Sequence, residues 1–255
     1  MHWAWAGAIL VGLSLGLLGA GGSILTVPVL VYLVGVPEKL AIAESLAIVG
    51  LISAAGSVPF MYRSQVEGRN VLFFGVPGMG GTYLGAFLSK YFPGSVQLVL
   101  FAAVMLFAAG MLYNDPRKGL EEGEAPEHAA WKIVGEGLGV GVLTGLVGVG
   151  GGFLIVPALV LLGGLPLFLA IGTSLAIIAL KSFSGFYKYV DVLAQAGLEM
   201  DWSLIGLFGV LGILGSVAGS RIGRYVPRQV LKKAFSVLLV AMAGYVLYQN
   251  LPQLL

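Results

Sequence analysis

The sequence predicts an all-α, polytopic helical membrane protein made of two homologous halves in an inverted repeat. Of its 255 residues, 58% are hydrophobic and 10% are charged, with a mean hydropathy of +0.97. A soluble domain carries about 25% charged residues, so the surrounding solvent is expected to be lipid. The stretch GLLGAGGSILTVP, Gly16 to Pro28, recurs 129 residues later as GLVGVGGGFLIVP, Gly145 to Pro157. The third observation is a Lys/Arg bias that reverses between the halves.

Each half contains five apolar segments. In the first half they are Trp3–Leu18, Ser23–Val34, Leu40–Tyr62, Asn70–Phe92 and Ser95–Tyr113. In the second half they are Trp131–Val147, Phe153–Leu162, Leu167–Tyr189, Trp202–Val226 and Val230–Tyr248. We therefore expect a first transmembrane repeat over residues 1–113, a polar cytoplasmic linker over 114–130 and a second repeat over 131–255. The first apolar run has no Lys or Arg before it, which favours a retained helix over a signal peptide.

The second segment of each half is too short to span a membrane. Ser23–Val34 has 12 residues, or about 18 Å of helix, against a hydrocarbon core about 30 Å thick. Pro28 lies inside it. We expect a re-entrant hairpin in each half, with the helix broken at the glycine cluster. Irregular backbone at membrane depth requires protein or a watery cavity around it.

The duplication extends beyond the glycine clusters. AIAESLAI, Ala41 to Ile48, matches AIGTSLAI, Ala170 to Ile177. After an insertion the offset becomes 134, and Gly78, Gly81 and Gly85 match Gly212, Gly215 and Gly219. Repeated halves are the usual architecture of secondary transporters.

The positions of Lys and Arg predict the orientation of the halves. Arg63 and Arg69 follow the third segment of the first half, whereas Arg221, Arg224 and Arg228 follow the fourth segment of the second. Because basic residues favour the cytoplasmic side, both loops and the linker are predicted to lie inside, with both termini outside. The halves are then inverted relative to each other.

The two hairpin tips are the candidate anion site. The candidate residues are Gly19, Ala20, Gly21, Gly22, Ser23 and Thr26 in the first half, and Gly148, Val149, Gly150, Gly151 and Gly152 in the second. Glycines allow a ligand to approach the backbone, and the half-helices that follow direct free N–H groups at it. The alternative is that these small residues serve only helix packing, the role we assign to the later glycines of each half.

These motifs resemble the TauE/SafE family, the sulfite exporter-like membrane permeases. The resemblance covers both halves and is most specific over Gly145 to Leu162. It implies transport of small sulfur-containing anions, such as sulfite, sulfonates and related organic acids, across a bacterial or archaeal inner membrane. It does not fix which anion. Where the second half has Gly172–Thr173–Ser174, the first has Ala43–Glu44–Ser45, so a purely anion-binding role for Glu44 is in doubt.

Ionisable residues within the apolar segments are functional candidates by default. Lys181 is expected to attract the anion, and Glu44 is the candidate to carry a coupling proton. With inverted halves the two charges come to a similar depth, where they would neutralise each other. Lys188 and Glu136 are interpreted as interfacial. Hydroxyls on the same helices are candidates to line a path: Ser45, Thr173 and Ser174, with Ser53, Ser182 and Ser184.

The sequence therefore predicts a secondary transporter of a small anion, with alternating access between the repeats. The alternatives are an ion channel or a cation carrier, and less readily an intramembrane enzyme. The expected partners are a small anionic substrate, the lipid bilayer and a proton or other coupling ion. We expect no cofactor, no metal and no nucleic acid.

Overall fold

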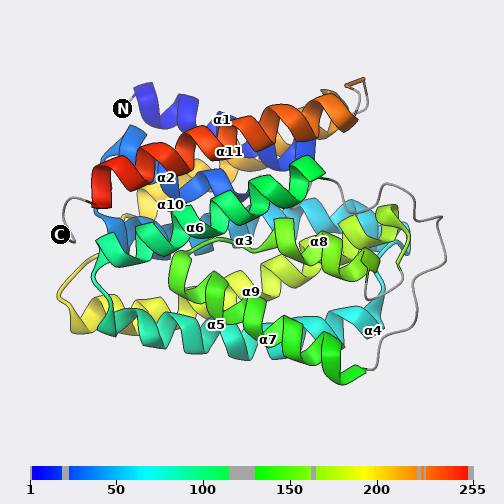
Figure 1. The fold of residues 1–255 in the computed structure, drawn as a ribbon, viewed down its shortest axis with the longest axis horizontal. Helices are drawn as coiled ribbons and strands as arrows, with labels where there is room; N and C mark the ends of the chain where they lie inside the picture. The colour runs from blue at the N-terminus through cyan, green and yellow to red at the C-terminus, as the bar shows by residue number, and fades with distance from the viewer. Residues whose placement is uncertain are drawn as a thin grey trace.

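The computed structural model describes residues 2–18, 23–114, 130–161, 165–222, 225–226 and 228–251. Every regular element in these residues is a helix (Figure 1). The first half contains α1 (His2–Leu18), α2 (Thr26–Pro28), η2 (Val29–Val34), α3 (Glu38–Tyr62), α4 (Gly68–Asn70), η3 (Val71–Gly75), α5 (Val76–Leu88), η4 (Ser89–Tyr91) and α6 (Gly94–Asn114). The second half contains α7 (Ala130–Val147), α8 (Gly152–Leu161), α9 (Leu167–Gln195), α10 (Trp202–Ile222) and α11 (Arg228–Asn250).

The ten predicted apolar segments are helical, with small shifts at their ends. In the described residues, five helices are long and apolar enough to cross a membrane: Glu38–Tyr62, Gly68–Tyr91, Gly94–Met111, Leu169–Gln195 and Trp202–Ile222. The predicted all-helical membrane protein is thus confirmed. The largest difference is at α9, which continues six residues beyond the predicted end at Tyr189. Val192 and Leu193 are buried there, and Gly197, with a φ of +67°, follows the helix end.

The short second segment of the first half folds back along α1. A β-carbon built on Gly7 would lie 2.6 Å from Val29 Cγ1 and 3.1 Å from Leu33 Cδ2, so the residues nearest the N-terminus meet the end of the second segment. In the second half the chain enters along α7 and returns toward the same end of the molecule along α8 (Figure 1). Each second segment therefore turns back toward the end of the molecule at which the helix before it begins.

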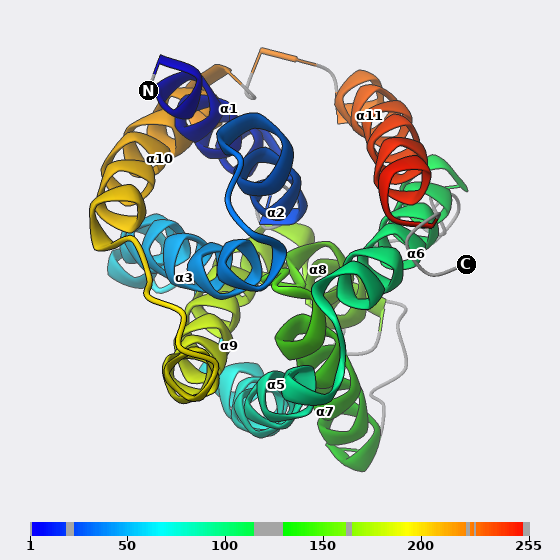
Figure 2. The ribbon, with the colours of Figure 1, turned by 90° about the vertical axis from the view of Figure 1, so that its left-hand side faces the viewer.

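Helices α3 and α9, the third segments of the two halves, cross at the centre of the molecule (Figure 2). A β-carbon on Gly185 would lie 3.2 Å from Leu46 Cδ1, and one on Gly56 would lie 3.6 Å from Leu175 Cδ1. Contacts that lie later on α3 lie earlier on α9, so the helices are antiparallel. The two contacts are also equivalent, because Leu46 and Gly56 match Leu175 and Gly185 in the repeat.

Each half packs its first segment against the fourth segment of the other half. On α1 and α10, a β-carbon on Gly12 would overlap the carbonyl oxygen of Gly212, and one on Gly219 would overlap that of Leu13. The matching contacts join α7 and α5, where Gly141 meets the carbonyl of Gly78 and Gly85 meets that of Val142. These backbones approach so closely that only glycine fits. The packing role predicted for the later glycines agrees with these contacts.

The ends of the helices fall into two groups (Figure 1). The start of α1 and the end of α11 lie at one end of the molecule, whereas α4, the end of α6 and the end of α10 lie at the other. Helices α6 and α11 pack together and run in opposite directions, joined by a hydrogen bond from Ser236 Oγ to the Ala109 carbonyl (2.8 Å).

Candidate functional site

The turn between α7 and α8 is a buried irregular stretch held by three backbone hydrogen bonds. Gly148 N donates to the Thr144 carbonyl at 2.9 Å, and Leu154 N and Ile155 N donate to the Gly151 carbonyl. Gly148 and Gly151 have φ of +77° and +70°, a left-handed conformation that strains other residues. The glycine cluster thus marks the predicted helix break, and the Gly151 carbonyl already accepts two of the four first-turn N–H groups of α8, those of Leu154 and Ile155.

The turn is fastened to α3 by a serine of the second repeated motif. Ser45 Oγ contacts the Gly148 carbonyl oxygen at 2.6 Å and the Ile42 carbonyl oxygen at 2.7 Å. A β-carbon on Gly148 would lie 2.8 Å from Ile42 Cγ2 and from the Ile42 carbonyl oxygen. The structure therefore brings the two repeated motifs together, with Ser45 as an anchor of the tip.

Lys181 reaches the same turn from α9 and is fully buried. Its Nζ lies 3.2 Å from Thr144 Oγ1. A β-carbon on Gly151 would lie 3.2 Å from this Nζ, and one on Gly78 would lie 2.8 Å from the Lys181 Cδ. The side chain therefore passes Gly78 of α5 and ends beside the α7–α8 turn.

The second hairpin tip also meets the start of the first half-helix. A β-carbon on Gly150 would lie 3.4 Å from Ser23 Cβ, 2.6 Å from Val49 Cγ1 and 2.8 Å from Ile178 Cγ2. Val49 and Ile178 are equivalent in the repeat. The tip thus lies between matching positions of α3 and α9.

The other predicted tip residues differ in how far they can be placed. Gly19, Ala20, Gly21 and Gly22 lie outside the described residues. Ser23 and Thr26 are fully buried, and Thr26 Oγ1 has no hydrogen-bond partner within the described part of the chain. Val149 and Gly152 are buried in the second tip, beside Gly150 and Gly151.

Glu44 and Thr173, which are equivalent in the repeat, perform matching structural tasks. Glu44 Oε1 accepts a 3.0 Å hydrogen bond from Asp201 N, and Thr173 Oγ1 accepts one of 3.0 Å from Glu67 N. Glu67 and Asp201 are themselves equivalent, and each side chain accepts a hydrogen bond from the backbone at the start of a fourth segment. Each pair thus ties a third segment to the start of the opposite half's fourth segment. The second oxygen of Glu44, Oε2, is buried and has no partner in the described residues.

The predicted pairing of Glu44 with Lys181 is wrong in this structure. Glu44 binds Asp201 N, and Lys181 binds Thr144. The antiparallel register, with Leu46 beside Gly185, places Glu44 about six residues, or about 9 Å along the helix axis, from the level of Lys181. The expectation of similar depth failed because it assumed a span of about 30 Å, whereas α3 and α9 have 25 and 29 residues, or about 38 and 44 Å of helix.

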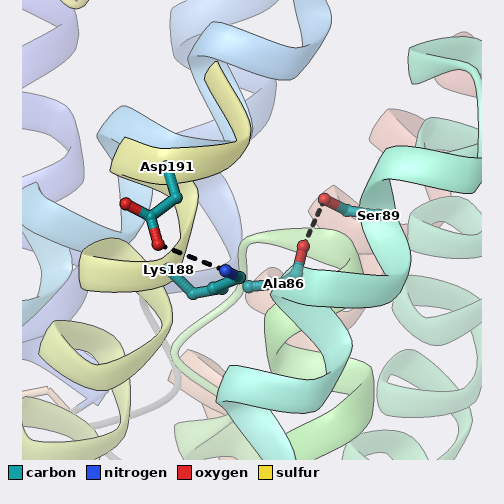
Figure 3. Close-up of polar contacts among 4 residues, drawn as sticks. All are labelled: Ala86, Ser89, Lys188 and Asp191. Carbon is teal, nitrogen blue, oxygen red and sulfur yellow. Dashed lines mark hydrogen bonds and ion pairs between the residues drawn. The ribbon is translucent and has the colours of Figure 1, made fainter. Parts of the chain in front are cut away.

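Other polar side chains on these helices have local roles. Ser174 Oγ donates to the Ile171 carbonyl within its own helix, at 2.8 Å. Lys188 Nζ lies 3.2 Å from Asp191 Oδ2, near the end of α5, where Ser89 Oγ donates to the Ala86 carbonyl (Figure 3). The Lys188 ammonium also lies 5.4 Å from the centre of the Tyr83 ring. These contacts agree with the interfacial interpretation of Lys188.

Two residues of the site were missed from the sequence. Thr144 was not singled out, and Gly78 was assigned to packing alone. The sequence signal that could have identified this site is a difference between the two halves. Polar residues of the second half, Thr144 and Lys181, are equivalent to the apolar Leu15 and Ile52 of the first. Among the described residues, the cavity that borders Thr144 and Gly151 has a volume of about 10 Å³, room for about one water molecule.

Comparison with known proteins identifies the family. The family model described as "Sulfite exporter TauE/SafE" matches residues 4–246. The chain belongs to the TauE/SafE family. It is therefore a multi-pass cell-membrane protein of a transporter family. No solved structure matches it.

Relatives of this TauE/SafE protein carry transporter names. A "probable membrane transporter protein" of Xylella fastidiosa (strain 9a5c) is 32% identical over 248 residues, covering 94% of this chain and 92% of the relative. The "probable membrane transporter protein YunE" of Bacillus subtilis (strain 168) is 26% identical and covers 88% and 87%. One from Methanocaldococcus jannaschii is 22% identical over 92% of this chain and 91% of its own length. These names indicate a membrane transporter rather than an enzyme.

Proposed function

We propose that this TauE/SafE protein is a secondary transporter of a small anion, bound at the α7–α8 turn beside Lys181. The observation that carries the proposal is the fully buried Lys181 amine, whose hydrogen-bond partner in the described residues is one neutral hydroxyl. In the described residues, the ion pair that the structure contains is Lys188 with Asp191. A buried charge without a counter-ion costs several kcal/mol, and a bound anion would supply that counter-ion.

The donors around the turn favour an oxyanion. The ammonium of Lys181 has three N–H donors, of which Thr144 takes one. The first turn of α8 adds backbone N–H groups and the positive end of a ten-residue helix. Thr144 Oγ1 itself contacts the Val140 carbonyl at 2.7 Å, so its proton is already engaged. The free groups at the turn are thus donors, which suits sulfite, a sulfonate or a related organic acid.

The proposed mechanism is alternating access between inverted halves. Three observations support inversion: the antiparallel crossing of α3 and α9, the exchanged contacts of first and fourth segments, and the grouping of α4 with the end of α10. Inverted repeats allow one half to take up the conformation of the other, which opens a central site to the opposite face. Because the cavity at the turn holds about one water, an anion enters only when the halves move.

Glu44 remains the candidate for proton coupling. Its Oε1 is committed to Asp201 N, whereas Oε2 is buried without a partner in the described residues and offers a place for a proton. Thr173, its equivalent, makes the matching backbone contact with an uncharged hydroxyl. The structural task therefore needs no carboxylate, which leaves the acidic group available for coupling.

The test measures binding and flux of one set of anions with purified protein. Sulfite, thiosulfate, methanesulfonate and acetate are titrated by calorimetry, and the tightest binder is followed into proteoliposomes. We expect saturable flux, and a loss of affinity of about tenfold or more in Lys181→Met, since hydrogen bonds to charged groups are worth about 1.5–3 kcal/mol. Lys188→Gln is the matched control and keeps wild-type affinity. Unsaturable flux would indicate a channel, and unchanged affinity in Lys181→Met would refute the site.

A further inference from the structure

Two equivalent serines near the hairpin tip share with Thr26 a buried hydroxyl that has no hydrogen-bond partner in the described residues, unlike most buried hydroxyls of the helices. Buried Ser and Thr side chains here usually bond a carbonyl three or four residues earlier in their own helix. Those that do so are Ser14, Ser45, Ser57, Thr82, Ser89, Thr144 and Ser174. Ser53 and Ser182 are both 0% exposed, and neither hydroxyl has a hydrogen-bond partner in the described part of the chain.

The two serines lie on the helix faces that flank the second tip. Ser53 is one turn beyond Val49 and Ser182 is one turn beyond Ile178, the two residues on either side of Gly150. Residues four apart share a helix face. The antiparallel register places Ser53 and Ser182 about four residues, or about 6 Å, apart along the axis of the crossing. A single small ion therefore fits between their levels.

The side chains of Ser182 and its neighbour Lys181 lie on different faces of α9. Consecutive residues are about 100° apart on a helix. The Lys181 amine points between α5 and α7, past Gly78 to Thr144, whereas the Ile178–Ser182 face borders the tip at Gly150. The hydroxyl pair is thus separate from the position beside the Lys181 amine.

We propose that Ser53 and Ser182 form a second binding position for the transported anion, at the crossing of α3 and α9. This inference rests on the proposed function. A buried hydroxyl without a partner costs stability, and the passing anion supplies the missing acceptor for each. The ammonium of the adjacent Lys181 favours an anion over a cation there. Because each half contributes one of the two hydroxyls, the binding position contains the same two groups before and after the halves move.

The experiment separates affinity from turnover in the double variant Ser53→Ala/Ser182→Ala. The probe is the tightest-binding anion from the set of sulfite, thiosulfate, methanesulfonate and acetate. We expect its Kd to stay within about twofold of wild type, because Lys181 is intact, and its maximal flux to fall about tenfold or more as the transit position loses both donors. The matched control is Ser57→Ala, whose hydroxyl bonds the Ala54 carbonyl in its own helix, and it keeps wild-type flux.

Each result has one interpretation. Wild-type flux in the double variant overturns the second position while the proposed function stands. A loss of affinity as large as that of Lys181→Met shows one shared site and also overturns it. No binding or flux of any probe by the wild-type protein refutes the proposed function, and this inference with it. The melting temperature reports folding and is expected to be unchanged or higher in the double variant, because no native hydrogen bond is removed.

Discussion

Lys181 and Ile52 occupy equivalent positions in the two halves, and each side chain lies against the matching glycine of a fourth segment. The Lys181 Cδ packs where a β-carbon of Gly78 would be, and the Ile52 Cδ1 packs against Gly212 in the same way. The hydrogen bond from Lys181 to Thr144 has no counterpart in the first half, because the residue equivalent to Thr144 is Leu15. The same packing against a glycine of the fourth segment therefore accommodates an isoleucine in the first half and a lysine in the second.

This asymmetry predicts opposite effects on stability. Lys181→Met removes a buried unpaired charge while keeping an unbranched chain, so we expect the melting temperature without ligand to rise. Ile52→Lys buries a charge among Leu15 and the α1–α10 contacts and is expected to lower it by about 5 °C or more. Thermal unfolding in detergent measures both. A lower melting temperature in Lys181→Met would mean that the ammonium has a stabilising partner.

Two glycines in the left-handed conformation, Gly151 and Gly197, allow the effect of backbone strain to be distinguished from an effect on ligand binding. Gly151→Ala places a methyl group 2.7 Å from Thr144 Oγ1 and 3.2 Å from Lys181 Nζ, so it displaces the amine. We expect anion affinity to fall about tenfold. Gly197 has a similar φ of +67° but open space around it, so Gly197→Ala adds strain alone and keeps wild-type affinity. Calorimetric titration of both variants checks this, and equal affinities would contradict the role of the turn.

Most of the fold follows from the sequence because the repeat and the apolar segments are local signals. The glycines that interlock α5 with α7 could be assigned to packing because their spacing places them on one helix face. The missed parts depend on contacts between distant residues. The link from Glu67 N to Thr173 joins opposite halves, and nothing near either residue indicates it. Thr144 was missed because a hydroxyl within an apolar segment ordinarily bonds its own helix, which it also does.

The close backbone contact between α5 and α7 at Gly141 predicts that a substitution with no role in binding can prevent folding and assembly. Gly141→Val would drive a branched side chain into the Gly78 carbonyl of α5, so we expect loss of folded protein from the membrane. Gly139→Val is the matched control on the same helix, since no atom of the described residues lies within 4 Å of its β-carbon position. The yield of monodisperse protein after extraction measures both variants. Normal yield of Gly141→Val would show that α5 and α7 are free to separate.

The predicted orientation can be tested with single cysteines, because the chain contains none of its own. Arg69 lies in α4 and Arg221 in the last turn of α10, at the end of the molecule opposite the termini. We expect Arg69→Cys and Arg221→Cys to resist an impermeant thiol reagent added to intact cells and to react after permeabilisation. Tyr91→Cys and Tyr248→Cys, which are exposed and belong to the other end, are expected to react without permeabilisation. Labelling of Arg69→Cys and Arg221→Cys from opposite sides would contradict inversion.

Glu44→Gln tests whether the carboxyl group couples transport to protons. Gln keeps a side-chain oxygen for Asp201 N, so the tie between α3 and the start of α10 is expected to survive and the melting temperature to stay near wild type. If a proton travels on Oε2, the variant still exchanges anion for anion across proteoliposomes but no longer responds to an imposed pH gradient. Thr173→Val is the matched control, because it removes the equivalent tie to Glu67 N without touching a charge. It is expected to lower stability by about 1 kcal/mol, the net worth of one hydrogen bond, and to keep the response to the gradient. An undiminished response in Glu44→Gln would remove this carboxyl group from the coupling mechanism and leave it the structural task that Thr173 performs in the other half.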